Sequence, residues 1–268
     1  MNDNVFARNE GNRIVYYRIA SASGSRLWDQ HWEETVNGSS DFYDRYAKGH
    51  LGYNRLRHVL LKYLPKQQGN ILEAGCGLGQ YVLALRARGY NCIGLDFTFK
   101  TISRLKNLFP DLPVIAGDIR HLNLKNESLS AYISLGVVEH FTDGPQIALK
   151  EAARVLKKDG TLIVSVPQAF RWRRLTAHPE DTPLPDEASF YQHAFSASEF
   201  RNMLKDAGFN VKAEYGHSLL YAFRLRFKLF RKLLTRYPKL SHIDILTDRL
   251  PFGHNLSRMR FYIATKGS

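Results

Sequence analysis

Short apolar runs alternate with segments of helical periodicity along the middle of the chain, and this alternation constrains the fold more than any other feature. The runs are rich in Val, Ile, Leu and Ala, and the segments between them repeat apolar residues at helical spacing. Parallel strands need such runs, because helices cover both faces of their sheet. The pattern predicts an α/β fold with a doubly wound, mostly parallel sheet whose first five strands cover residues 70–75, 91–96, 112–118, 129–136 and 160–167.

The rest of the chain adds two further strands and two insertions to this pattern. The added strands are predicted at 210–216 and 259–267, after a helix that Ser196 or Ser198 can cap and that Gly208 ends. A chain of 268 residues can bury the core of one large domain. We therefore expect a single domain, residues 1–268, with a leader or cap at 1–50, a core at 51–167, and insertions at 168–195 and 218–259 after the fifth and sixth strands.

Three glycines at alternate positions follow the first strand, in the stretch GNILEAGCGLGQ. Glycine at such a spacing lets backbone approach a ligand closely. The positions Gly75, Gly77 and Gly79 depart from the G-x-G-x-x-G fingerprint of dinucleotide-binding proteins. Glu73, in the strand before them, would repel a pyrophosphate but suits a cationic amino group. Asp96 follows the next strand at the same rim of the sheet, where a carboxylate accepts hydrogen bonds from two adjacent hydroxyls. Together these residues fit a dehydrogenase poorly.

In their order along the chain, these residues resemble the class I S-adenosylmethionine-dependent methyltransferases, in particular the small-molecule branch that includes quinone-biosynthesis enzymes. The resemblance covers about residues 51–209 and rests on the stretches ILEAGCGLG, IGLDFT, AGDIRHL, SLGVVEHF and EAARVLKKDGTLIVSVP. It implies a Rossmann-like sheet of seven strands with an antiparallel last strand. It also implies S-adenosylmethionine as the cofactor, with S-adenosylhomocysteine as its product.

The resemblance further implies a set of cofactor contacts. The glycine loop is expected to hold the amino acid end, Asp96 the two ribose hydroxyls with Phe97 beside the adenine, and Asp118 the adenine amino group. The full set of expected cofactor-binding residues is Glu73, Ala74, Gly75, Cys76, Gly77, Gly79, Asp96, Phe97, Asp118, Ile119, Leu135 and Gly136. The sequence FTFKT after Asp96 departs from the Ser-Pro pair usual in the family, which leaves the shape of this loop open.

Methyl transfer from a sulfonium needs no covalent nucleophile, because an acceptor atom held on the axis of the methyl group displaces it in line. A base that deprotonates an acceptor hydroxyl assists, and His140 and Glu139 follow the fourth strand beside the expected cofactor site. Each also has a structural interpretation, since His140 can orient the loop and Glu139 can bind backbone amides. Second-rank candidates are His31, His50, Tyr43, Tyr46, Tyr191 and His193.

The formal net charge of +13 permits nucleic acid, an anionic membrane or an acidic small molecule as a partner. One basic cluster is RWRR at 171–174, and the other is the segment 219–236, which contains no acid. On a helical wheel the apolar residues of 219–236 share one face and its basic residues another. This is typical of a helix docked on its own domain, or of one that contacts an anionic membrane or an acidic, lipid-linked substrate.

Both insertions leave the rim of the sheet at which ligands bind in open α/β folds, so we expect them to roof the acceptor site. The expected acceptor is a small molecule, a lipid-linked compound or a saccharide, and an anionic acceptor is one option. An RNA methyltransferase is the main rival hypothesis, although no Asn-Pro-Pro-Tyr motif, Pro-Cys nucleophile or RNA-binding module is recognised, which makes nucleic acid the less favoured partner. The sequence also leaves open a non-catalytic cofactor-binding regulatory module and a nicotinamide oxidoreductase.

The two cysteines, Cys76 and Cys92, have no metal-ligand spacing, and we expect no metal. The N-terminal stretch lacks the layout of a signal peptide, and no run approaches the roughly 20 apolar residues that cross a bilayer. These features predict a cytoplasmic protein in a reducing compartment, with peripheral membrane contact as a further option.

Overall fold

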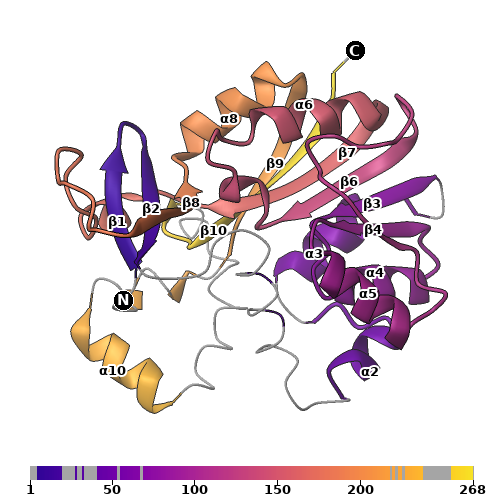
Figure 1. Ribbon diagram of the computed structural model, residues 1–268, viewed down its shortest axis with the longest axis horizontal. Coiled ribbons are helices and arrows are strands. Elements are labelled where there is room, and N and C mark those ends of the chain that lie inside the picture. The colour runs from indigo at the N-terminus through magenta and orange to yellow at the C-terminus, as the bar shows by residue number, and fades with distance from the viewer. Residues whose placement is uncertain are drawn as a thin grey trace.

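The computed structural model describes residues 5–19, 28, 32, 41–52, 55–66, 69–217, 219–220, 223–224, 227–237 and 255–267. Within these residues the main sheet has seven strands in the order β5-β4-β3-β6-β7-β10-β9 (Figure 1). Their bounds are β3 Asn70–Ala74, β4 Cys92–Asp96, β5 Val114–Ala116, β6 Leu129–Leu135, β7 Leu156–Pro167, β9 Phe209–His217 and β10 Met259–Lys266.

The strand directions confirm the predicted sheet. The five strands β5, β4, β3, β6 and β7 run parallel, and β10 pairs antiparallel with both β7 and β9. At the centre of the sheet, Leu72 of β3 pairs with Tyr132 of β6, which pairs with Leu162 of β7. All three belong to the same buried cluster. The alternate residues Ile71, Ile133 and Ile163 belong to the other buried cluster, so the apolar runs are buried on both faces, as a parallel core requires.

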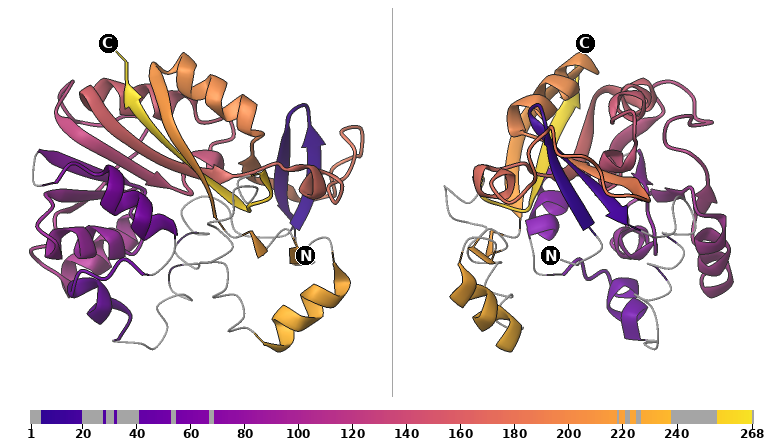
Figure 2. Two further views of the ribbon diagram at one scale, coloured as in Figure 1. Left: turned by 180° about the vertical axis from the view of Figure 1, so that it is seen from behind. Right: turned by 60° about the vertical axis from the view of Figure 1, so that its left-hand side comes forward.

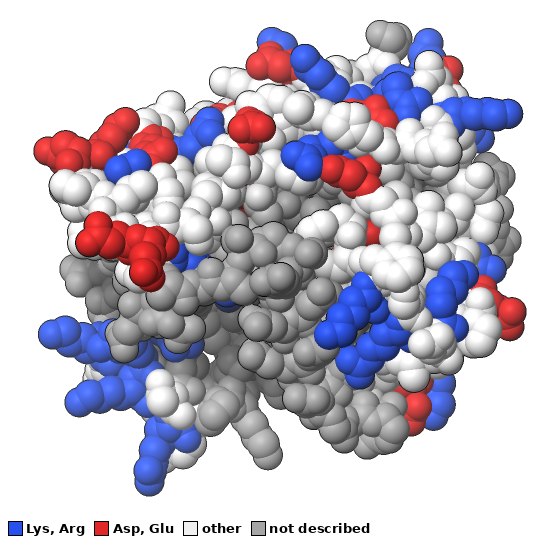
Figure 3. Space-filling model, viewed as in Figure 1, with Lys and Arg blue, Asp and Glu red and all other residues white. Residues whose placement is uncertain are grey.

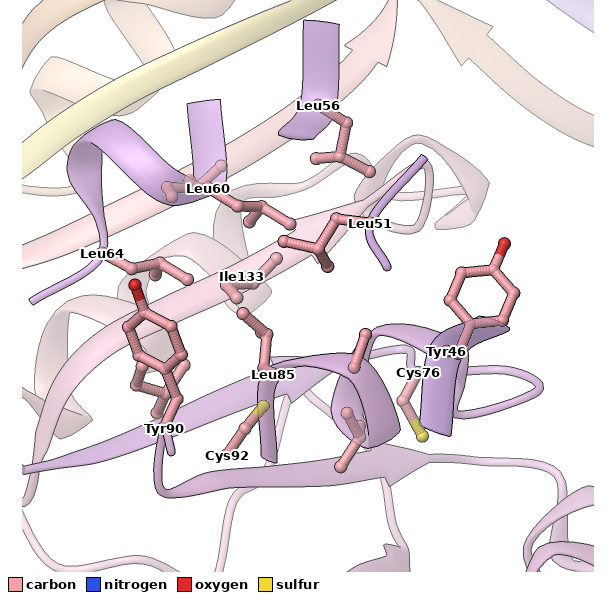
Figure 4. Close-up of a cluster of buried hydrophobic side chains, with 14 of the residues drawn as sticks. Tyr46, Leu51, Leu56, Leu60, Leu64, Cys76, Leu85, Tyr90, Cys92 and Ile133 are labelled. Atoms are coloured by element: carbon pink, nitrogen blue, oxygen red, sulfur yellow. The ribbon is translucent and has the colours of Figure 1, made fainter. Parts of the chain in front are cut away.

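Helices cover the two faces of the sheet (Figure 1). One face carries α3 (Arg55–Tyr63), α4 (Gln80–Ala87) and α5 (Phe99–Leu108), and the other carries α6 (Gln146–Val155) and α8 (Ala197–Asp206). Figure 4 shows the first of these layers, in which leucines of α3 and α4 meet Ile133 of β6. Cys76 and Cys92 are buried there as free thiols.

One helix is shorter than its sequence pattern predicts. Apolar residues between Gly144 and Gly160 repeat at helical spacing and predict one helix over 144–160, whereas α6 ends at Val155 and β7 begins at the next residue. Leu156 is fully buried and pairs with Leu129 of β6, so its burial in the sheet outweighs the helical preference of the lysines that follow.

A second, three-stranded antiparallel sheet stands beside the main one (Figure 2). It consists of β1 (Val5–Glu10), β2 (Arg13–Ile19) and β8 (Ala188–Ala194), in the order β1-β2-β8. These strands were not predicted, because their sequence suggested an irregular leader at 1–50 and a connection at 168–195. Ile14 of β2 is fully buried against Ala169 and Ala194, which ties this small sheet to the end of the main one. We call the β1-β2-β8 sheet the roof.

The remaining described elements are α2 (Asp41–Ala47), the short helix η1 (Val138–His140), α7 (Arg171–Arg174) and α10 (Lys228–Arg236). The helix predicted over 219–236 is not continuous, because Phe227 has the extended angles φ −118° and ψ 113° and α10 begins after it. No helix in the described ranges has the length and apolar content to span a membrane.

Candidate functional site

A cavity of about 360 Å³ opens at the carboxyl ends of the central parallel strands. Its floor comes from the segments that follow β3, β4, β5 and β6, and its cover includes Ser189, Phe190 and Tyr191 of the roof. Open α/β sheets bind ligands at this rim, because the loops leaving neighbouring strands diverge there. Of the expected cofactor-binding residues, those that line the cavity are Gly75, Asp96, Phe97, Asp118, Ile119, Leu135 and Gly136.

The glycine loop between β3 and α4 is packed so closely that side chains would not fit. Gly75 has φ +82°, and a Cβ atom there would lie 2.4 Å from Cγ2 of Val137. At Gly77, with φ +48°, a Cβ would lie 2.6 Å from the indole of Trp32. Gly79, the N-cap of α4, faces Leu105 and serves packing. Bare backbone at Gly75 therefore lines the cavity, which suits a ligand held by main-chain atoms.

Asp96 ends β4 and connects two loops at the floor of the cavity. Its Oδ2 accepts a hydrogen bond from the Gly77 amide at 2.9 Å, and its Oδ1 accepts bonds from the amide and hydroxyl of Thr98. A carboxylate offers about four acceptor sites, so these bonds leave room for one to a bound hydroxyl. The protein bonds fix the orientation of the carboxylate before any ligand arrives.

Phe97 and Asp118 also line the cavity, next to Asp96. Phe97 is 51% exposed, so its ring is free to pack against a flat apolar ligand. Asp118 forms an ion pair with Arg120, whose Nη2 lies 2.6 Å from Oδ2, and this hydrogen-bonded guanidinium lowers the pKa of Asp118. The Asp118 carboxylate is therefore ionised at neutral pH and already shared with an arginine.

Five of the expected cofactor-binding residues do not line the cavity: Glu73, Ala74, Cys76, Gly77 and Gly79. Glu73 is 3% exposed, and burial raises its pKa to about 8. The carboxyl that the sequence suggested as a partner for a cationic group is thus mainly protonated in the ligand-free protein. Burial also raises the pKa of the Cys76 thiol, which makes it a packing residue.

The two candidate bases after β6 differ in placement. His140 lines the cavity, and its Nδ1 lies 2.8 Å from the carbonyl oxygen of Tyr191. Because a carbonyl only accepts, Nδ1 carries the proton, and in the neutral ring Nε2 is the acceptor nitrogen. The Trp28 indole packs edge-on against the same ring at 4.7 Å.

Glu139 is buried outside the cavity lining, at 2% exposure, and burial raises its pKa to about 8. Its Oε2 has no hydrogen-bond partner within the described part of the chain. Of the two candidates, His140 is therefore the one that reaches a bound molecule.

The second-rank candidates are scattered. Tyr191 lines the cavity, whereas Tyr43 and Tyr46 pack in the core layer of α3 and α4. His193 is buried, which lowers its pKa, and His50 is exposed. His31 lies outside the described residues.

Sequence reasoning missed several residues of the wall. Arg18, Trp28 and Trp32 line the cavity from the N-terminal region, together with Phe141 and Thr142 after β6. The stretch SRLWDQHWEE holds the two tryptophans as an aromatic pair, which is a signal visible in the sequence, whereas Arg18 carries no local signal. No group of three or more potential metal ligands occurs among the residues the structure describes.

Comparisons with known proteins report what the chain is similar to in sequence and in fold. Residues 72–164 match the family described as a methyltransferase domain. A probable S-adenosylmethionine-dependent methyltransferase of Mycolicibacterium smegmatis is 29% identical over 185 residues, which is 69% of this chain and 66% of that protein. A human protein named probable tRNA methyltransferase 9B is 26% identical over 196 residues, 72% of this chain and 40% of that protein.

Among solved structures, a putative methyltransferase of Haloferax volcanii, in complex with the Trm112 methyltransferase activator, superposes with a TM-score of 0.60. It is 17% identical, and the match covers 91% of this chain and 98% of that one, which shows a shared fold. The chain spans less than two thirds of the length of either sequence relative.

Proposed function

We propose that this chain, whose core belongs to the class I S-adenosylmethionine-dependent methyltransferases, transfers the methyl group of S-adenosylmethionine to an acceptor held between the sheet rim and the roof. The observation that carries the proposal is the continuous cavity that joins Gly75 and Asp96 on the floor to His140 and Tyr191 under the roof. One side has the groups that suit the cofactor, and the other is enclosed by aromatic residues.

The residues present fit this cofactor. Asp96, held in place by Gly77 and Thr98, would accept a hydrogen bond from a ribose hydroxyl, and the exposed ring of Phe97 would pack beside the adenine. The bare backbone at Gly75 would lie along the amino acid end. When bound, S-adenosylmethionine supplies a methyl group activated by the positive sulfonium.

Three properties of the chain would then support transfer. The roof residues Ser189, Phe190 and Tyr191 cover part of the cavity and would shield a bound acceptor from water, which limits competing reactions. The aromatic walls restrict how an acceptor lies, and such positioning accounts for much of the acceleration of a two-substrate reaction. His140 would accept a proton at Nε2 from an acceptor hydroxyl or ammonium, while the Tyr191 carbonyl stabilises the charged ring through Nδ1–H.

The direct test of this function is incubation of the protein with methyl-labelled cofactor and fractionated cell extract. Label entering a lipid, glycan or small-metabolite fraction is expected, and His140→Ala should lower the rate by about 10² while leaving cofactor affinity unchanged. An unchanged rate in His140→Ala would withdraw the catalytic role of this residue. Tight cofactor binding without label transfer to any fraction would favour the non-catalytic regulatory module.

An RNA acceptor is a second candidate, which the charge of +13 and the human relative named for tRNA favour. A basic surface binds RNA in a strongly salt-dependent way. A salt-dependent gel shift, with label entering the RNA fraction, would support this candidate. Label confined to small molecules would exclude it.

The helix α10 favours an acceptor that resides at a membrane. It carries Lys228, Arg231, Lys232 and Arg236 and no acid, and Figure 3 shows these blue side chains gathered at one corner of the molecule. Beside them Leu229 is 81% exposed and Leu233 is 42% exposed. Exposed apolar residues flanked by cations are the features with which helices insert into anionic bilayer surfaces. We therefore extend the proposal to peripheral contact with anionic lipid through α10.

Vesicle sedimentation tests this contact. Wild-type protein should bind vesicles of phosphatidylglycerol and phosphatidylcholine but not vesicles of phosphatidylcholine alone. The double change Arg231→Glu and Lys232→Glu should weaken binding by roughly tenfold or more, at about 1 kcal/mol per basic residue. A matched control is Lys150→Glu with Lys158→Glu, two exposed lysines elsewhere. Equal loss in both double variants, or equal binding to the two vesicle types, would contradict a specific role for α10.

A further inference from the structure

Within the described ranges, one arginine enters the cavity without forming an ion pair. Arg18, on β2, lines the cavity, and its buried Nε finds no hydrogen-bond partner among the described residues. The other arginine of the cavity wall, Arg120, is paired with Asp118. Arg8 and Arg13 of the same hairpin are also paired, with Glu10 and Glu199.

The roof holds this guanidinium in a defined place. Its carbon lies 4.2 Å from the centre of the Tyr191 ring, a cation–π contact. The register between β2 and β8 shifts between Tyr16 and Tyr17, so that Tyr191 becomes the unmatched residue of a bulge. A β-bulge changes the direction in which the side chains of the bulged strand point. Arg18 is thus fixed by the fold and faces the same space as Tyr191.

Tyr191 also connects this guanidinium to the proposed base. Its carbonyl oxygen accepts the hydrogen bond from Nδ1 of His140, and the two rings lie 5.2 Å apart. A group bound by Arg18 would therefore belong to a molecule that extends toward His140. This places Arg18 on the acceptor side of the cavity, whereas Asp96 and Phe97 define the cofactor side.

A half-buried guanidinium with an unsatisfied Nε is costly unless a ligand supplies the missing acceptor. The planar guanidinium matches a carboxylate or a phosphate, which accept two parallel hydrogen bonds. We propose that Arg18 binds a carboxylate or phosphate group of the methyl acceptor and thereby selects anionic acceptors. The inference rests on the proposed function in one respect, namely that the molecule occupying this side of the cavity is the acceptor.

A carboxylate bound by Arg18 could also belong to the cofactor, because the amino acid end of S-adenosylmethionine carries one. Calorimetry with S-adenosylhomocysteine separates the two sources. In Arg18→Met, which keeps an unbranched apolar stem but removes the charge, affinity for this compound should stay within about twofold of wild type. A loss of about tenfold or more would assign Arg18 to the cofactor and overturn the acceptor role.

The positive test uses two probes that differ in charge but hardly in shape, benzoate and benzamide. They are titrated into protein saturated with S-adenosylhomocysteine, and binding is followed by the fluorescence of Trp28 and Trp32 in the cavity wall. Benzoate should bind wild-type protein about tenfold or more tightly than benzamide, because it accepts charge-assisted hydrogen bonds. Arg18→Met should abolish this preference, and Arg18→Lys should keep part of it.

Arg8→Met is the matched control, since Arg8 lies on the neighbouring strand, pairs with Glu10 and does not line the cavity. It should keep the full preference for benzoate. Equal affinity for the two probes, no saturable binding of benzoate, or a preference that persists in Arg18→Met would overturn the proposal. If wild-type protein fails to bind S-adenosylhomocysteine, the proposed function fails, while the two titrations on unliganded protein still decide the role of Arg18.

Discussion

The two sheets that enclose the cavity are specified by the sequence in different ways. The main sheet is built from local βαβ units, and its strands β3, β4 and β6 are mostly apolar and mostly buried. The roof joins the N-terminal hairpin to a strand more than 160 residues later in the chain, with Ile14 opposite Ala194. Its strands mix arginines, tyrosines and glutamate with few buried residues.

This difference separates two roles. The local units place Gly75, Asp96 and Asp118 at one rim, where we propose that the cofactor binds. The roof depends on individual polar contacts, such as the hydrogen bond of 2.6 Å from Nε of Arg173 to the Tyr16 hydroxyl. We infer that changes in the roof alter acceptor recognition while leaving cofactor binding intact.

The largest effect is expected from Asp96→Ala in the cofactor half. The charge-assisted hydrogen bond to a ribose hydroxyl would be lost, and so would the bonds with which Asp96 holds the backbone at Gly77 and Thr98, so affinity for S-adenosylhomocysteine should fall by about 10³, or roughly 4 kcal/mol. Calorimetry measures the loss, and circular dichroism checks the fold. The control Asp111→Ala changes an exposed acid that does not line the cavity and should bind normally. An affinity within a few-fold of wild type for Asp96→Ala would contradict the assigned site.

A pair of glycine variants tests the close packing of the loop. Gly75 and Gly89 have nearly equal angles, φ +82° and +84°, but only the Cβ added at Gly75 would collide with a neighbour, Val137. Both Gly→Ala changes incur backbone strain, and Gly75→Ala should cost about 3 kcal/mol more in the free energy of unfolding. Urea denaturation measures the difference. Equal destabilisation would show that the loop tolerates a side chain.

Glu139 lies near the junction of the two halves, where burial raises its pKa although the positive charge of Arg173 acts to lower it. Its folded pKa of about 8 is raised above the ordinary value, so its contribution to stability is present below about pH 4 and is lost as pH rises toward 8. Glu139→Gln should therefore gain about 2 kcal/mol relative to wild type between about pH 5 and pH 7. Glu73 titrates in both proteins, so its contribution cancels when the stability of the variant is compared with that of wild type. Parallel stability curves over this range would refute the raised pKa.

The smallest effect is expected in the roof. Tyr16→Phe removes the hydroxyl that accepts from Arg173 and should cost about 1 kcal/mol. Hydrogen exchange should accelerate in β2 but not in β3, and affinity for S-adenosylhomocysteine should not change. Tyr17→Phe is a control that leaves the bond between Arg173 and Tyr16 in place, since the hydroxyl of Tyr17 donates to Glu10 instead. Acceleration in both sheets would show that the two halves open as one unit.

The same contrast explains what the sequence could predict. All seven strands of the main sheet and the antiparallel last strand follow from apolar runs and the family resemblance, because local patterns and short connections determine them. The roof could not be predicted, because its strand β8 pairs with β2, which lies more than 160 residues earlier in the chain. Arg18 was missed for the same reason: nothing near it in the chain distinguishes it from the other cations.

Burial is the other property that the sequence did not reveal. Glu73 was expected as an ionised partner for the cofactor and Glu139 as a base, yet both lie beneath the cavity wall with raised pKa values of about 8. Their positions at strand ends are visible in the sequence. Which way each side chain points depends on packing against helices distant in the chain.

The most direct test of the whole account is isothermal calorimetry of well-folded wild-type protein with S-adenosylmethionine and with S-adenosylhomocysteine. The account predicts saturable binding of both compounds at one site per chain, with competition between them. The absence of binding heat at several temperatures, with no shift in the thermal unfolding midpoint, would contradict it.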